Sequence, residues 1–173
     1  GRSGMPTLVQ LMGPYHELFA DSLSVLITQS WNAILMTKLK LPVSHRQRFG
    51  IVQAKSAQPE IQRQELKLAE KLLMFRAFTQ GVAVDAKIFS AQHRHNRYSQ
   101  FYPVRSYIRA LAESSFRQHP DDLLFVLAEA IYQELELRLK HKTLYQLTLP
   151  EMNRSLIERL RELTSADGSL INR

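Results

Sequence analysis

The chain has 173 residues, 45% of them hydrophobic, which suits one globular domain with a real core. It contains no cysteine, which excludes disulfides, thiolate zinc sites and cysteine nucleophiles. The net charge of +7 favours an anionic partner, and no apolar run approaches the ~18 residues of a membrane-spanning helix.

The domain organisation is simple. Residues 1–4 precede the first methionine and are typical of an expression-tag remnant. No linker, internal repeat or low-complexity segment divides the remainder, so we expect residues 5–173 to form a single domain. The N-terminus lacks the charged and then apolar pattern of a secretory signal, which together with the missing cysteines favours a cytoplasmic protein.

The first long helix is predicted to follow Gly13-Pro14, because a proline is well placed in a first helical turn. Apolar residues then recur at three- and four-residue steps and predict one buried stripe that ends near Leu41-Pro42. The stripe consists of Tyr15, Phe19, Leu23, Leu26, Ile27, Trp31, Ile34, Leu35 and Leu39. Trp31 is therefore assigned to the core.

The middle of the chain predicts three more helical segments. A short helix is expected over residues 44–55, and a strongly amphipathic helix over 61–78. Gly81 closes the second of these by taking the left-handed conformation that terminates helices. A short helix over residues 84–92 then leads into a loop.

The last third shows the clearest start signals. Pro103 opens a helix with Val104, Ile108 and Leu111 inward. Two carboxylates in the segment 119–122 lie at the positive end of the next helix, which runs to about residue 141.

Thr148 and Glu151 have the spacing of a capping box and predict a final helix, followed by a polar tail from about Thr164. No segment alternates with period two. The fold class is therefore all-α, a bundle-like array of six or seven helices.

The positive charge is concentrated in the first two thirds of the chain. Residues 1–112 hold 15 Lys+Arg and 6 Asp+Glu, whereas residues 113–173 hold 8 and 10. This asymmetry predicts one basic face for an anionic partner and another for packing. The leucine-rich C-terminal helices of mixed charge suit self-association, so a homo-oligomer is one expectation.

Two windows lack acidic residues altogether. The second half of the window 22–59 gathers basic and titratable side chains around a proline-bounded turn: Lys38, Lys40, His45, Arg46, Arg48 and Lys55. They could contact several phosphates, each of which makes affinity fall with salt. The same residues could equally be a solvated connector.

The second acid-free window, 86–112, is the sharper candidate for binding. Its predicted contacts are Lys87, Arg94, Arg97, Arg105 and Arg109. Arg105 and Arg109 are four residues apart on one helix, so they share a face and could grip successive phosphates.

The aromatic residues of this window divide in two. Tyr98 and Tyr102 are candidates for stacking on unpaired bases, while Phe101 and Tyr107 are assigned to the core. The alternative for the whole window is a solvated loop that leads into an amphipathic helix.

Other chemistry has weak support. A helix-turn-helix around Gly81 would use residues 84–92 as its recognition helix, but Arg76 and Lys87 stand where that motif needs apolar side chains. His93 and His95 lack the further ligands that zinc requires, so no metal site is predicted. No phosphate-binding glycine loop and no nucleophile-elbow pattern occurs, so we expect neither an enzyme nor a cofactor.

These observations favour a non-enzymatic domain that binds DNA or RNA through its basic surface, possible regulatory DNA binding included. The contacts expected are Arg94, Arg97, Arg105 and Arg109, helped by Lys87, Arg46 and Arg48. The alternative is a helical adaptor or assembly subunit that binds an acidic protein through the same face.

Overall fold

The computed structural model describes residues 7–34, 60, 74–89, 97–141 and 147–165. These residues form four α-helices and two short 3₁₀ turns and contain no β-strand, which confirms the all-α fold class for this part of the chain. The helix predicted over 44–55 and residues 61–73 of the helix predicted over 61–78 lie outside the described residues.

Helix α1 (Leu8–Thr28) begins earlier than predicted. Thr7 is its N-cap and forms a capping box with Gln10, whose side chain accepts from the Thr7 N–H at 2.8 Å. Pro14 lies inside the helix, so the predicted start after Gly13-Pro14 is wrong. A proline removes only one backbone donor, and here its ring is buried in the core.

The end and the buried face of α1 also differ from the prediction. The helix ends at Thr28, where Gln29 takes the left-handed conformation with φ 52°, so Trp31 lies beyond it. Its inward side chains include Leu18, Val25 and Leu26. Leu23 and Ile27, which the predicted stripe assigns to the core, are 39% and 64% exposed.

The described residues 74–89 contain two 3₁₀ turns, η1 (Met74–Arg76) and η2 (Ala86–Ile88). The chain leaves helical geometry after Arg76, so no helix continues to residue 78. Gly81 does have a positive φ of 70°, as expected, but it lies in a turn. Residues 84–89 contain only the three-residue η2, which contradicts the helix predicted there.

The remaining helices lie close to their predicted positions. They are α6 (Tyr102–Glu113), α7 (Asp122–Lys140) and α8 (Leu149–Ser165). Pro103 occupies the first turn of α6, and Asp122 the first turn of α7. The capping box at α8 is confirmed, because the Glu151 carboxylate accepts from the Thr148 N–H at 2.7 Å.

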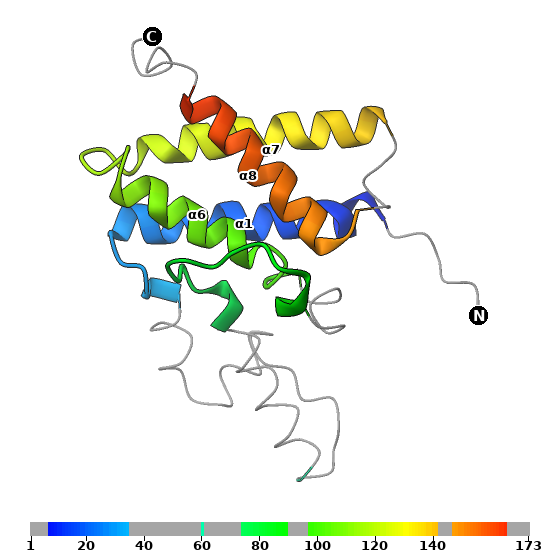
Figure 1. Ribbon diagram of the computed structural model, residues 1–173, viewed down its shortest axis with the longest axis horizontal. Helices are drawn as coiled ribbons and strands as arrows, with labels where there is room; N and C mark the ends of the chain where they lie inside the picture. The colour runs from blue at the N-terminus through cyan, green and yellow to red at the C-terminus, as the bar shows by residue number, and fades with distance from the viewer. Residues whose placement is uncertain (1–6, 35–59, 61–73, 90–96, 142–146, 166–173) are drawn as a thin grey trace.

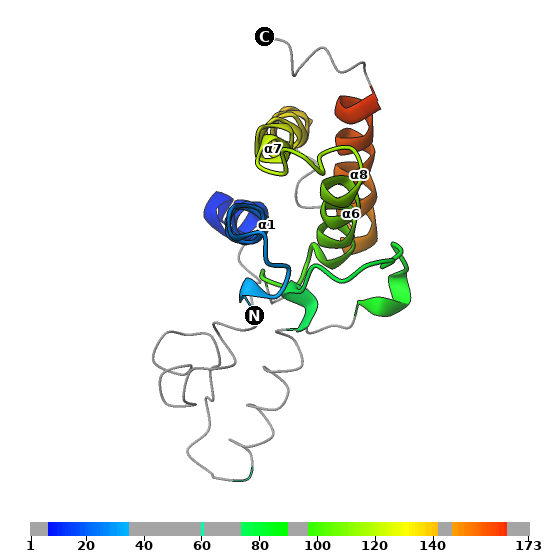
Figure 2. The same ribbon diagram turned by 90° about the vertical axis from the view of Figure 1, so that its left-hand side faces the viewer.

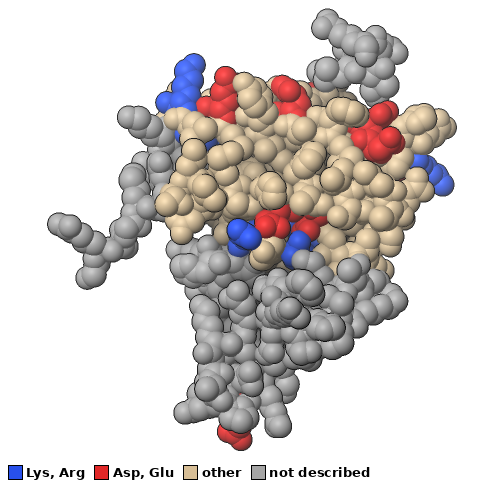
Figure 3. Space-filling view, turned by 180° about the vertical axis from the view of Figure 1, so that it is seen from behind, with Lys and Arg blue, Asp and Glu red and all other residues tan. Residues whose placement is uncertain are grey.

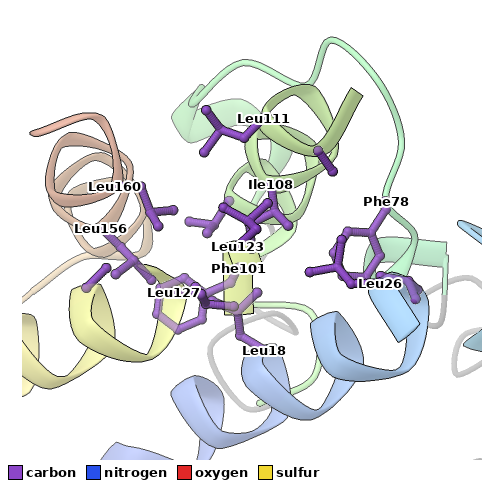
Figure 4. Packing of buried hydrophobic residues seen from close by; sticks show 14 of the residues in the cluster. Leu18, Leu26, Phe78, Phe101, Ile108, Leu111, Leu123, Leu127, Leu156 and Leu160 are labelled. Atoms are coloured by element: carbon purple, nitrogen blue, oxygen red, sulfur yellow. The ribbon is translucent and has the colours of Figure 1, made fainter. Parts of the chain in front are cut away.

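The four helices pack as two layers, with α1 and α7 in one layer and α6 and α8 in the other (Figures 1 and 2). All four helices contribute buried apolar side chains to the space between the layers (Figure 4). The 78–101 region adds Phe78 and Phe101, whose ring lies 4.8 Å from that of Tyr15.

The core also contains buried polar side chains. Asn153 of α8 is fully buried and donates to the backbone oxygens of Gln100 at 2.7 Å and Leu149 at 2.8 Å. Glu134 of α7 is fully buried as well, and Arg138 donates to it at 2.8 Å. Such groups are stable in a core only when they are partnered.

Candidate nucleic-acid interface

Arg105 is buried completely, and this overturns its predicted role as a surface contact. It lies on the core side of α6, where its Nη2 donates to Asp21 Oδ2 at 2.7 Å. Burial lowers the pKa of the Arg105 guanidinium, and the charge of Asp21 opposes that shift. A guanidinium held in this way cannot reach a phosphate outside the molecule.

Asp21 is the residue that the sequence prediction missed. It follows Leu18 by three positions and precedes Val25 by four, so the helical period places it on the core side of α1. Besides Arg105, its carboxylate accepts from Arg76 Nε at 2.9 Å and from Arg76 Nη2. This buried cluster ties α1 to η1 and α6, and it is structural because none of its three members reaches the surface.

Arg109 also serves the fold. Its Nε donates to Glu113 at 2.9 Å, its Nη1 donates to the Phe78 oxygen at 3.0 Å, and its guanidinium lies 5.3 Å from the ring centre of Trp31. Hydrogen bonds from Gln80 and from Arg109 hold the pKa of the Glu113 carboxyl below its usual value. The predicted pair of outward guanidiniums at positions 105 and 109 is therefore not formed.

Arg97 remains accessible, with 54% of its side chain exposed. Its Nε lies 3.3 Å from Glu17 Oε1, and its Nη2 donates to the Tyr98 hydroxyl at 3.0 Å. That hydrogen bond raises the pKa of Arg97. The Tyr98 ring already contacts two guanidiniums, Arg76 at 4.4 Å and Arg97 at 5.0 Å, so stacking on a base would compete with cation–π contacts.

The other predicted contacts differ in their surroundings. Lys87 is exposed on η2, whereas Tyr102 is half-buried with its ring 5.0 Å from that of Phe75. The rings of Tyr98 and Tyr102 therefore both already contact other side chains and are not freely available for stacking on a base. The remaining predicted contacts and the two histidines weighed as metal ligands lie outside the described residues: Arg46, Arg48, Arg94, His93 and His95. The helix-turn-helix hypothesis fails on the described part of its recognition helix, where η2 is a single short turn.

The described helices do not carry the net positive charge of the chain. The 109 described residues contain 11 Lys+Arg and 13 Asp+Glu, a balance of −2. The other 64 residues contain 12 and 3, a balance of +9. The described helical body is therefore nearly neutral, and the excess of positive charge belongs to the rest of the sequence.

Both basic stretches join the body along one edge. Residues 29–34 precede the first stretch, η1 follows it, and η2 and the turn 97–101 flank the second. Side-chain contacts hold three of these segments in place, because the Trp31 ring lies 6.1 Å from that of Phe78 and Arg76 of η1 contacts Tyr98 of the turn 97–101. Figure 2 shows them grouped below α1 and α6. We call these four segments the attachment edge.

The described residues thus form an all-helical body whose attachment edge borders the sequence segments 35–73 and 90–96. No family model, no curated protein and no solved structure matches the chain. None of the helices in the described ranges is long and apolar enough to cross a bilayer.

Proposed function

We propose that this chain is a non-enzymatic nucleic-acid-binding domain, in which a nearly neutral helical body holds basic segments along the attachment edge. The observation that carries the proposal is the separation of charge, −2 in the described body and +9 in the rest. A polyanion gains most from cations that are close together in space, since each neutralised phosphate releases counterions.

The contacts differ from those that the sequence alone suggests. Arg105 and Arg109 form ion pairs with Asp21 and Glu113. The proposal therefore rests on the stretches 35–59 and 90–96 together with Arg97 and Lys87. Arg97 and Lys87 are exposed cations that lie where the second stretch joins the edge. Regulatory DNA binding by a helix-turn-helix is no longer part of the proposal.

The test is binding of unrelated duplex DNA, single-stranded DNA and RNA fragments across a salt series. For the wild-type chain we expect log Kd to rise linearly with log salt concentration. The double variant Arg46→Ala/Arg48→Ala and the double variant Arg94→Ala/Arg97→Ala should each flatten that slope, by about 0.9 per lost phosphate contact on duplex DNA and about 0.7 on single strands.

The matched control is Arg154→Ala/Arg161→Ala, which removes the same charge from exposed positions on α8 that belong to none of the four edge segments. It should leave the slope nearly unchanged. If this control flattens the slope equally, the effect depends on the net charge of the chain and not on the attachment edge. If the wild type binds no nucleic acid at low salt, the proposal is wrong, and the adaptor that binds an acidic protein becomes the better account.

A further inference from the structure

The most exposed large apolar side chains of the described residues all belong to two neighbouring helices. Five lie on α1 and three on α7: Leu8, Val9, Met12, Leu23, Ile27, Phe125, Tyr132 and Leu139. Exposure reaches 77% for Val9 and 78% for Phe125. Figure 3 views the molecule from this side, which we call the α1/α7 face, and most of its described surface is uncharged.

Helix α1 presents no charged group to solvent. Besides His16, its only acidic or basic side chains are Glu17 and Asp21, which are 15% and 4% exposed because both face arginines. Soluble protein surfaces normally carry about 25–35% charged residues. A helix of 21 residues whose outer side lacks Lys, Arg, Asp and Glu is typical of one that packs against another protein.

The area of this face is sufficient for a specific interface. With about 200 Å² for a fully exposed aromatic or long aliphatic side chain, the exposed fractions of the eight residues amount to roughly 900 Å². A standard interface buries about 800 Å² on each partner. The patch also exceeds what a monomer usually leaves uncovered, about 300–600 Å².

The spacing on both helices suits helix packing. Phe125, Tyr132 and Leu139 are seven residues apart on α7, and Val9 and Leu23 are two such steps apart on α1. The two helices run antiparallel, as the colour order in Figure 1 shows. Residues at seven-residue intervals lie on the same side of a helix, so each set forms a stripe along its helix.

We propose that a second copy of this chain covers the α1/α7 face and forms a symmetric dimer around α1. The exposed carboxylates of Glu129 and Glu136 lie one turn after Phe125 and Tyr132 on α7 and would repel a phosphate backbone or an anionic lipid surface. A second α1 brings no Lys, Arg, Asp or Glu to the outer side of the helix and offers an equal apolar area. A two-fold dimer needs only this one surface, since the same patch serves both copies.

The test is the mass of the full chain in solution, measured by sedimentation equilibrium over a wide concentration range. The wild type should be a dimer that dissociates on dilution. The double variant Ile27→Asp/Phe125→Asp should weaken the dimer by at least about 100-fold and give a monomer at the same concentrations. Both positions are exposed, so its helical circular dichroism should be unchanged.

The matched control is Ser115→Asp, which adds an acid at an exposed position in the turn after α6. It should retain the dimer mass. A wild-type monomer at every concentration overturns the proposal and leaves the face to a different protein. A dimer that survives in the double variant overturns it too, because the contact must then lie on another surface.

Discussion

Replacing Asp21 with alanine should destabilise the fold more than any surface change. The substitution leaves Arg105 with no acceptor at Nη2, and its Nε and Nη1 already lack one among the described residues. Arg76 keeps the carboxylate of Glu17, at 3.8 Å, and its cation–π contact with Tyr98. Removing one partner of a buried ion pair costs about 3–5 kcal/mol. For a chain of this length that is a fall in Tm of roughly 6–20 °C.

The assay is urea and thermal unfolding of Asp21→Ala beside Glu129→Ala, which removes the same charge from an exposed site on α7. The control should change the free energy of unfolding by no more than about 0.5 kcal/mol. A second comparison isolates the buried charge. Adding Arg105→Met to Asp21→Ala removes the unpaired cation and should recover part of the loss, because an apolar group of similar length needs no partner.

Two results would refute this reasoning. If Asp21→Ala is no more destabilising than Glu129→Ala, the buried cluster does not support the fold. If the double variant loses as much as the sum of the two single variants, Arg105 and Asp21 are not coupled, because residues in one ion-pair network deviate from additivity by about 0.5–3 kcal/mol.

Two further predictions concern other buried groups. Burial, with the charge of Glu134, raises the pKa of the Tyr15 phenol above its ordinary value, so stability is fully present below about pH 10 and falls at higher pH as the unfolded chain ionises. Tyr15→Phe should flatten this fall in stability when unfolding is measured across pH, and a fall that remains would come from another group. At neutral pH the substitution should change the free energy of unfolding little, because the hydroxyl has no partner among the described residues and the ring contact with Phe101 remains. Asn153→Ala should cost about 2–4 kcal/mol in urea unfolding because it strips partners from buried backbone groups, including the Gln100 oxygen; a loss no larger than that of Arg154→Ala, an exposed neighbour, would show that these bonds contribute nothing.

The helices that were predicted well carry their own boundary signals. Pro103 at the start of α6, the carboxylate of Asp122 in the first turn of α7 and the Thr148–Glu151 capping box of α8 all act within one helical turn. Local signals of this kind depend on nearby backbone groups and not on the rest of the fold. The sequence therefore contains them in full.

The prediction for α1 failed because the helix has two apolar sides. Periodicity finds a stripe of large side chains but cannot tell which of two stripes faces the core. Leu23 and Ile27 fit a helical repeat as well as Leu18 and Val25 do, yet only the second pair is buried. The early start had a local signal that was missed, since Thr7 and Gln10 have capping-box spacing.

The candidate site could be predicted only in part. Arg97 and Lys87 are exposed cations, whereas Arg105 is buried because its acceptor comes from a helix 84 positions earlier in the chain. Basic residues four apart show a shared helix face, but the sequence does not say whether that face is covered. A long-range ion pair of this kind leaves one local sign, an acid such as Asp21 among core positions.

Helix α1 thus reverses the usual arrangement of a surface helix, with its acids inside and apolar side chains outside. The inner half is stable because Arg76 and Arg105 neutralise Asp21, and the outer half becomes stable when another apolar surface covers it. The two halves should therefore be coupled. Loss of Asp21 loosens the attachment of α1 to η1 and α6, and it should also weaken the proposed dimer, even though Asp21 is buried and Ile27 is exposed on the other face of the helix.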